Sequence, residues 1–468
     1  DSRQSRGLGD VYKRQDLHVN VLYALFTRTS PPSMVSSAEH SGTKAKWLRI
    51  IRKHHQLFSD SIGRMTCPPF EFTLKEPNTY SKRRPYPMSP EKTLALSKIV
   101  QTLIDNDIIE PSTSILWNSP IILILKPSGL YRFICDLSHV NRLVNNVPVS
   151  YPRPDDIFEF CIDAHYLFQI DCKDFYFCRE IAEHCRDPLT FTVPSHGAMR
   201  FKRLPQGFIA SSAAAIVPVI NHLRPVLFKT ALMHSDDVLG WGNCEQHSCK
   251  VFDTTCQLLS EMGLTTGCLK VAILLDKADY VAHIIGGGRA WPSPKMSAKL
   301  DLLKTPTSVK QVQHFNGLIQ YYAAYLPMVA HYKSKLSELT MDGAQWVWTD
   351  EHTEAVETIK FLLKHAVLYI IDWRCDTWVI TDASERALAG CLMMLDDNGI
   401  FKPLRYMSRS LTKLEMRYEN RERELRAATY CFQKCESVLL HRQFWWATDH
   451  ANAAFVLKSA ESNMRVAR

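Results

Sequence analysis

The sequence predicts a multidomain protein of the mixed α/β and α+β classes, and three observations support this. Its 468 residues correspond to about three domains, each long enough to bury its own core. Short apolar runs typical of strands end on an aspartate, as at Asp171 and Asp382, and amphipathic stretches typical of helices lie between them. With 46% hydrophobic and 22% charged residues, the composition excludes a largely disordered chain.

The first 70 residues carry little periodic pattern. Residues 1–15 form a polar, Arg-rich stretch, which we interpret as an artefact or a non-native leader and exclude from fold reasoning. Residues 16–70 are rich in Ser and in basic side chains, and we predict a lead-in linker there. Regular structure is therefore expected from about residue 71.

A well-marked helix opens the first predicted domain. Ser89 is a typical N-cap, Pro90 suits the first turn, and Glu91 places a carboxylate near the positive end of the helix dipole. The amphipathic pattern continues to about Ile108. Mixed helices and strands follow until three consecutive glycines break the pattern, so we place the end of this domain at 287.

Two further segments follow the glycine break. Residues 288–367 hold several prolines and a helix predicted from Ser308 to about Leu326. From about Leu368 the pattern returns to alternating strands and helices, which predicts an α/β domain over 368–468.

Three aspartates in two strand-like segments form the first candidate site. Asp171 ends one apolar run, and Asp236-Asp237 interrupt another. Carboxylates at strand ends can hold Mg²⁺, and two such ions can clamp the attacking and leaving oxygens of a phosphoryl transfer. An acidic pair alone can also be a solvated turn, as we expect for Asp396-Asp397 before Asn-Gly. The metal hypothesis therefore depends on the flanking segments.

The flanking segments follow a specific order along the chain. They are Arg84-Pro85-Tyr86, Ser89-Pro90-Glu91, Ile108-Ile109-Glu110-Pro111-Ser112, Trp117-Asn118-Ser119-Pro120, Cys135-Asp136, Asn141, Tyr151-Pro152, Pro154-Asp155-Asp156 and Leu204-Pro205-Gln206-Gly207. This ordered set resembles the reverse transcriptase of gypsy-type LTR retrotransposons.

The resemblance implies a right-hand polymerase, with fingers and palm over 71–287 and a thumb or connection over 288–367. It also implies that Asp171, Asp236 and Asp237 are catalytic and hold two Mg²⁺ ions, with Mn²⁺ as the alternative metal.

The same resemblance implies five substrate-binding residues. Lys126 and Arg132 flank a predicted hairpin turn and would direct positive charge at a triphosphate; an ordinary solvated hairpin is the alternative. Tyr176 would lie against the nucleotide sugar and exclude a 2′-hydroxyl, with a core aromatic as the alternative. Gln206 and Gly207 would allow close approach to a base pair, and a plain loop is the alternative.

A second acidic set lies near the C-terminus. Asp382 and Asp449 each end a strand-like run, and Glu422 and Glu424 lie on an Arg- and Glu-rich helical stretch. Together with Tyr406-Met407-Ser408-Arg409 and Tyr418, these residues are similar to the ribonuclease H domain that follows the polymerase in the same family. The resemblance implies two-metal hydrolysis of RNA in RNA–DNA hybrids, with two metal ions at this second site.

One ligand of this second site is ambiguous in the sequence. We predict Asp382, Glu422 and Asp449 as catalytic metal ligands, although Glu424 competes with Glu422 for the role. The alternative role of Glu422 is a helix salt bridge with Arg426. The chain reaches Arg468 before a fourth ligand, so we expect a C-terminally truncated domain.

The chain departs from the family pattern near both sites. His234 stands where a tyrosine usually precedes the acidic pair, and Ala387 and Ala389 replace glycines after Asp382. The predicted catalytic carboxylates are all retained. The main hypothesis is therefore an RNA-directed DNA polymerase with a tethered ribonuclease H-like domain. The alternative is a weakened retrotransposon relic or a host-adapted nucleic-acid-binding protein.

Charge and hydropathy agree with a nucleic-acid enzyme. A formal net charge of +8 favours polyanionic partners. The resemblance implies an RNA and DNA template-primer, RNA–DNA hybrids and dNTPs. No apolar run approaches the roughly 18 residues of a membrane span, so we predict a soluble cytoplasmic protein without a membrane partner, with retrotransposon particles as a further location. The 14 cysteines are expected to be free thiols.

Overall fold

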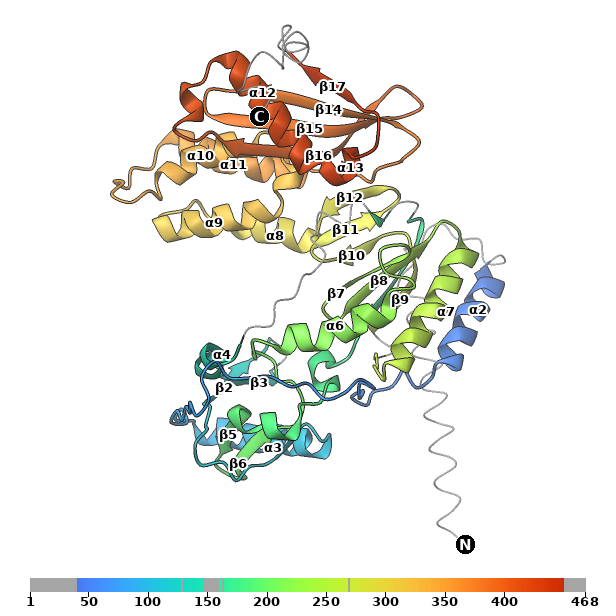
Figure 1. The fold of residues 1–468 in the computed structure, drawn as a ribbon, viewed down its shortest axis with the longest axis vertical. Helices are drawn as coiled ribbons and strands as arrows, with labels where there is room; N and C mark the ends of the chain where they lie inside the picture. Colours follow the sequence, from blue (N-terminus) through green and yellow to red (C-terminus); the bar gives the residue numbers. More distant parts are fainter. Residues whose placement is uncertain (1–39, 128, 146–159, 162–163, 268–269, 450–468) are drawn as a thin grey trace. The chain divides into compact units, whose positions relative to one another are not determined.

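The computed structural model describes residues 40–127, 129–145, 160–161, 164–267 and 270–449 (Figure 1). The chain divides into two compact units. The first contains Tyr166–Leu275 together with the described residues before 146. The second contains the described residues between 160 and 165 and those from Asp276 onward. The division precedes the predicted domain boundary at 287. No helix within the described ranges is long and apolar enough to cross a bilayer.

The predicted lead-in linker is wrong from His40 onward, because α2 (His40–Lys53) belongs to the core of the first unit. Trp47 is fully buried, and its ring lies 4.9 Å from that of Phe252 on α7 (Glu245–Glu261). Trp47 and Ile51 are four residues apart and share one helix face, which gives α2 an apolar side to bury. Residues 1–39, which include the predicted leader, lie outside the described ranges.

The first unit contains the predicted helix after Ser89. α3 spans Pro90–Asp105, and the Ser89 hydroxyl accepts a hydrogen bond from the Lys92 backbone N–H. The helix packs against β1 and β3. Around it lie a three-stranded sheet, a hairpin and a short helix: β1 (Ile109–Pro111), β6 (Gly197–Phe201), β5 (Thr190–Val193), β2 (Ile121–Leu125), β3 (Tyr131–Cys135) and α4 (Ser138–Leu143).

The central sheet of the first unit has four antiparallel strands in the order β7-β8-β4-β9. Helix α7 packs against β8 and β4, where Phe168 meets Phe252 edge to face. Gly240 is required here, because a Cβ at this position would lie 2.1 Å from the Phe168 ring. The strands and the second covering helix are β7 (Ala231–His234), β8 (Asp237–Gly242), β4 (Tyr166–Asp171), β9 (Val271–Leu275) and α6 (Ser211–Leu223).

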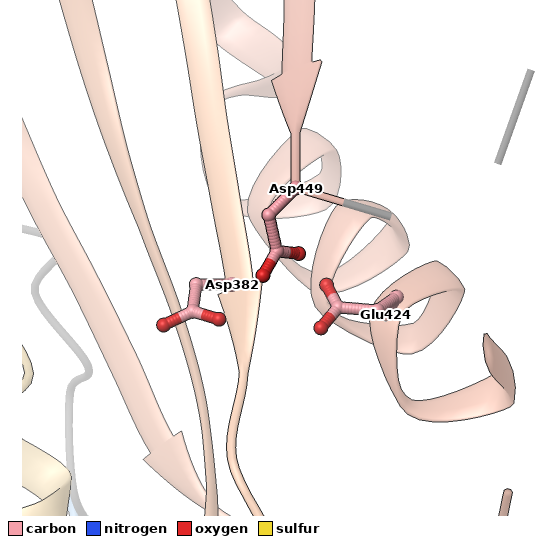
Figure 2. A group of neighbouring side chains, drawn as sticks. All are labelled: Asp382, Glu424 and Asp449. Atoms are coloured by element: carbon pink, nitrogen blue, oxygen red, sulfur yellow. The ribbon is translucent and has the colours of Figure 1, made fainter. Parts of the chain in front are cut away.

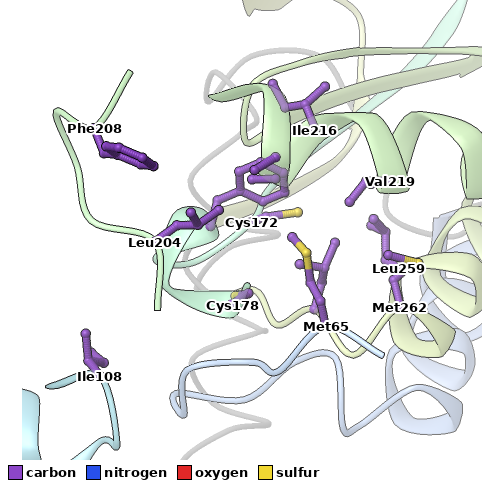
Figure 3. Close-up of a cluster of buried hydrophobic side chains, with 14 of the residues drawn as sticks. Met65, Ile108, Cys172, Cys178, Leu204, Phe208, Ile216, Val219, Leu259 and Met262 are labelled. Carbon is purple, nitrogen blue, oxygen red and sulfur yellow. The ribbon is translucent and has the colours of Figure 1, made fainter. Parts of the chain in front are cut away.

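A hydrophobic cluster joins these helices to the loop that follows β4. Figure 3 shows Ile216 and Val219 from α6 and Leu259 from α7 beside Cys172. All four side chains are buried and belong to one core. Close packing in this core therefore holds the chain directly after Asp171, the last residue of β4.

The second unit begins with a small antiparallel sheet, β10 (Ala278–Tyr280), β11 (His283–Gly286), β12 (Arg289–Pro292) and β13 (Leu368–Tyr369). The run of glycines is the turn of the β11–β12 hairpin rather than a break between domains. Gly287 and Gly288 have φ of +58° and +69°, which glycine adopts without a Cβ clash. Four helices follow in chain order: α8 (Pro294–Leu302), α9 (Val309–Tyr321), α10 (Val329–Glu338) and α11 (Asp350–Lys364).

The C-terminal part of the second unit is a mixed sheet in the order β16-β15-β14-β17. Strands β14 and β17 are parallel, and the other pairs are antiparallel. Helix α12 packs against β14 and β15. These elements are β14 (Asp376–Ala383), β15 (Ala387–Leu395), β16 (Phe401–Ser410), α12 (Asn420–Lys434), α13 (Glu436–Leu439) and β17 (Trp445–Thr448). The Asp396 carboxylate accepts the N–H of Asn398 and of Ile400, so this acidic pair forms the predicted turn.

A buried ion pair stabilises this C-terminal part. The Glu415 carboxylate accepts hydrogen bonds from both terminal nitrogens of Arg409, at 2.6 and 2.7 Å, and from the Thr412 N–H at 2.9 Å. These interactions, the one with Arg409 foremost, lower the pKa of Glu415 to about 2. Replacing one partner of such a pair leaves the other charge without its counterion.

Glu415→Gln is expected to lower the free energy of unfolding by about 2–3 kcal/mol at pH 7. Because the folded-state pKa is depressed, this stabilisation is complete above about pH 4.5 and is lost as the pH falls towards 2. Urea unfolding of parent and variant at pH 7 and pH 3 measures the difference. An equal difference at both pH values would contradict the assignment.

Candidate functional site

The central sheet of the first unit brings Asp171 and Asp237 opposite each other. Asp171 is the last residue of β4, Asp237 is the first of β8, and they are register partners. Asp236 lies in the turn between β7 and β8, and its carbonyl oxygen accepts the Cys172 N–H at 2.7 Å. Ser235 in this turn has φ +58°, a left-handed conformation that turns the chain sharply. All three predicted aspartates therefore lie at one end of the sheet.

Two donor side chains hold the paired aspartates. Lys270 Nζ donates to Asp171 Oδ1 at 2.6 Å. Gln169 Nε2 lies 3.1 and 3.0 Å from the two carboxylate oxygens of Asp237. The hydrogen bond to Asp171 raises the pKa of Lys270, and the charges of Asp171 and Asp236 add to this effect. Positive charge is thus already favoured beside Asp171, and carboxylate oxygens are ligands that a divalent cation prefers. Among the described residues, the three aspartates do not bring one oxygen each within 4.8 Å of one another.

Sequence reasoning did not identify Lys270 or Gln169. Gln169 lies two residues before Asp171, so strand periodicity places both on one face of the sheet, and this signal was available. Lys270 has no such signal. It reaches Asp171 only because β9 pairs with β4, with Val271 opposite Ile170.

A buried thiol directly follows strand β4. Cys172 follows Asp171 directly and is fully buried. Burial raises the pKa of Cys172 well above its usual value, and Cys178 and the three aspartates raise it further.

The second candidate site is a group of three acidic side chains that lie close enough together to hold a metal ion. One oxygen each of Asp382, Glu424 and Asp449 lies within 4.8 Å of the others. Figure 2 shows the two aspartates near adjacent strand ends and Glu424 reaching towards them from α12. Since β14 and β17 are parallel, their carboxyl ends meet at the same edge of the sheet.

Glu424 is the buried member of this group. Only 2% of its surface is exposed, and Oε1 accepts the Ala383 N–H at 3.2 Å. Within the described part of the chain, its Oε2 atom is buried without a hydrogen-bond partner. Burial, followed by the charges of Asp449 and Asp382, raises the pKa of Glu424 to about 7. A divalent cation would satisfy the free oxygen and offset the repulsion, so these residues fit a metal site.

The structure places Glu424 in this group, so the preference for Glu422 is corrected. Glu422 and Glu424 are two positions apart, so their side chains point about 200° apart around the α-helix. Only one of them can face the aspartates. Glu424 shares the buried face of α12 with Ala427, Ala428 and Cys431. This spacing was visible in the sequence. Arg426, the expected salt-bridge partner of Glu422, also lies 3.5 Å from Glu415.

The predicted phosphate-binding residues lie on the β2–β3 hairpin. Lys126 follows β2, and its backbone N–H and carbonyl pair with Leu130 and Gly129 across the turn. Arg132 lies on β3, opposite Ile124. Both basic side chains are exposed, which leaves them available to a ligand.

Tyr176 lies beside the turn between β7 and β8 in the first unit. It belongs to the 3₁₀-helix η1 (Phe175–Cys178) that follows Asp171. Its hydroxyl lies 3.3 Å from the hydroxyls of both Ser212 on α6 and Ser235. The ring is only partly buried and packs against the core of the first unit.

The loop at Gln206 and Gly207 is held by Asn141. The Asn141 side chain donates to the Gly207 carbonyl and accepts the Ile209 N–H, each at 2.9 Å. Gly207 has φ +87°, which requires glycine or strains another residue. Gln206 is exposed. The loop is therefore fixed in shape while its polar side chain faces solvent.

Sequence comparisons relate the chain to retroviral and transposon polyproteins. Residues 348–445 match the family model of the RNase H-like domain found in reverse transcriptase, starting before the predicted boundary at Leu368. The Gag-Pol polyprotein of Koala retrovirus is 25% identical over 80% of this chain and 22% of the relative. The Pol polyprotein from transposon 412 of Drosophila melanogaster is 25% identical over 79% of this chain and 30% of the relative.

A transposon Tf2-3 polyprotein of Schizosaccharomyces pombe is 23% identical over 85% of this chain and 30% of the relative. The chain therefore spans between 22% and 30% of the length of these three relatives.

Solved structures show the same fold. The foamy viral protease-reverse transcriptase in complex with dsDNA has a TM-score of 0.78 at 20% identity, over 95% of this chain and 90% of that one. The same protein with an RNA/DNA hybrid has a TM-score of 0.75 at 20% identity, over 96% and 59%. The predicted right-hand polymerase fold followed by a ribonuclease H-like domain is confirmed. The chain is thus similar to the Pol polyproteins of retroviruses and retrotransposons, and its residues 348–445 match the RNase H-like domain found in reverse transcriptase.

Proposed function

We propose that the chain is an RNA-directed DNA polymerase that uses two-metal nucleotidyl transfer, with a ribonuclease H-like domain directed at RNA–DNA hybrids. The observation that carries the proposal is the register pairing of Asp171 with Asp237, with Asp236 in the adjoining turn. In a homologue of Pol polyproteins, this sheet end is the expected place of DNA synthesis.

The polymerase carboxylates define where the reacting groups would lie. Asp171, Asp236 and Asp237 would hold Mg²⁺, which supplies charge neutralisation on the transferred phosphoryl and lowers the pKa of the primer 3′-hydroxyl. The antiparallel pairing of β4 with β8 fixes the spacing of the two strand-end carboxylates. The primer end and the α-phosphate of the nucleotide would meet at this end of the sheet.

Neighbouring side chains would place the nucleotide. Lys126 and Arg132 would bind the triphosphate, since exposed cationic groups on a hairpin suit a polyanion. The Tyr176 ring would lie against the sugar, held by its contacts to two serine hydroxyls. Gln206 and the backbone at Gly207 would contact the nascent base pair from a loop whose shape Asn141 fixes.

The ribonuclease H-like domain would use Asp382, Glu424 and Asp449. These carboxylates would hold the ions that activate water and stabilise the leaving oxygen during hydrolysis of the RNA strand. The buried Glu424 oxygen without a partner supports a role in metal binding rather than in packing.

Proposed partners are an RNA or DNA template-primer, RNA–DNA hybrids and dNTPs. Solved structures of the foamy viral relative contain dsDNA and an RNA/DNA hybrid. The formal net charge of +8 supports contacts to phosphates in this chain as well.

Extension of a DNA primer on an RNA template by the purified chain tests the proposal. We expect Mg²⁺-dependent extension that the Asp236→Asn/Asp237→Asn double variant abolishes. A folded chain that binds the template-primer without extending it would overturn the proposal. That result would favour a nucleic-acid-binding relic.

A further inference from the structure

Lys270 occupies a fixed place beside Asp171. Val271, the next residue, pairs with Ile170 across β9 and β4, so the backbone sets the position of Lys270. The Thr266 hydroxyl donates to the Asp171 carbonyl oxygen at 2.7 Å and ties the same two segments together. The 2.6 Å contact between Lys270 Nζ and Asp171 Oδ1 therefore follows from the pairing of the strands.

Gln169 holds the second carboxylate in a comparable way. Its amide lies within 3.1 Å of both Asp237 oxygens, across the β4–β8 pairing in which Gln169 is opposite Leu239. Gln169 is partly buried and uncharged. It can orient the carboxylate without neutralising it.

Lys270 and Gln169 respond differently to a bound cation, because Lys270 is charged and Gln169 is not. Asp171, Asp236 and Asp237 bring three like charges to one sheet end, and the Lys270 ammonium offsets part of their repulsion. The Lys270 side chain is 47% exposed, so it can return to solvent at low cost. A divalent cation would bring twice the positive charge of the Lys270 ammonium to the same carboxylate oxygens.

We infer that Lys270 and Gln169 are positioning residues of the polymerase site, and that Lys270 competes with a divalent cation for Asp171. This inference rests on the proposed function only in taking the three aspartates as metal ligands. Lys270 leaves Asp171 when the cation binds, whereas the Gln169 amide remains on Asp237. Lys270 thereby sets the metal concentration at which the site fills.

Mn²⁺ titration followed by electron paramagnetic resonance tests this competition. The full chain carries Asp382→Asn/Asp449→Asn, so that only the polymerase site is followed. Lys270→Met is expected to tighten Mn²⁺ binding about three- to tenfold, because the competing ammonium is gone. Lys270→Arg is expected to restore weaker binding.

Lys173→Met is the matched control. Lys173 lies two residues after Asp171, but its ammonium donates to the Asp60 carbonyl oxygen. Its loss removes the same charge nearby without removing a competitor at Asp171. We expect the Mn²⁺ affinity of this variant to stay within about twofold of the parent.

Thermal unfolding in EDTA and in Mn²⁺ gives a second readout. In EDTA, Lys270→Met is expected to lower Tm, because the three carboxylates lose a counterion. In Mn²⁺ it is expected to show a larger rise in Tm than the parent. A general packing defect would lower Tm in EDTA without enlarging the rise that Mn²⁺ causes, and this result would overturn the inference.

The outcomes separate this inference from the proposed function. Unchanged or weaker Mn²⁺ binding by Lys270→Met overturns the competition, provided that Asp237→Asn still weakens binding. If Asp237→Asn leaves Mn²⁺ binding intact, the aspartates are not the metal ligands, and the proposed function fails together with the inference.

Discussion

The Glu424→Gln variant is expected to bind divalent cations at the ribonuclease H-like site at least about tenfold more weakly than the parent, whereas Glu422→Gln stays within about twofold. Glu424 is buried, and one of its oxygens lies close to those of Asp382 and Asp449. Glu422 points from another side of α12 and lies outside this group. The two variants make the same chemical change two residues apart.

Mn²⁺ binding measured in an Asp236→Asn/Asp237→Asn background isolates this site. Loss of binding by Glu422→Gln with retention by Glu424→Gln would reverse the assignment. The expected loss of Mn²⁺ binding is not a loss of folding. We expect the Glu424→Gln variant to be at least as stable as the parent at pH 8 in EDTA. The pKa of Glu424 is raised to about 7, so the folded parent loses stability as the pH rises from about 4.5 through 7.

Asp171→Asn is expected to slow single-nucleotide incorporation about a thousandfold or more, because an amide is a poor ligand for a hard divalent cation. Asp174→Asn is the matched control. Asp174 is exposed and has φ +46°, a conformation that asparagine also accepts. Its replacement is expected to change the rate by less than about threefold.

Rapid-quench measurement of one incorporation step on an RNA template gives both rates. Template-primer affinity should stay within about threefold in each variant, which separates lost chemistry from lost binding. Equal losses in Asp171→Asn and Asp174→Asn would show that local charge, rather than a ligand at Asp171, controls the rate.

Strand-end carboxylates were the part of the site that the sequence could predict. An apolar run that ends on an acidic residue predicts a strand whose last side chain lies at a sheet edge, and Asp171, Asp237, Asp382 and Asp449 all lie at or beside strand ends. Local capping chemistry was equally readable, as at Ser89 before α3. Both signals are contained within a few consecutive residues.

Features that depend on long-range packing were missed. Lys270 meets Asp171 through the pairing of β9 with β4, and no local pattern encodes which strands pair. Helix α2 lies in a segment rich in polar and basic residues, and its stability comes from burying Trp47 against Phe252. Glu424 was readable from its spacing to Ala427 and Ala428 on the buried face of α12, although Glu422 was the predicted ligand.

Anomalous diffraction at the Mn absorption edge, from crystals of the chain with a chain-terminated primer, an RNA template and a dNTP, tests the central claim most directly. We predict Mn²⁺ peaks beside Asp171 and Asp237 and a separate peak among Asp382, Glu424 and Asp449. With the substrates bound, the absence of a peak beside Asp171 and Asp237 would contradict two-metal DNA synthesis at this sheet end.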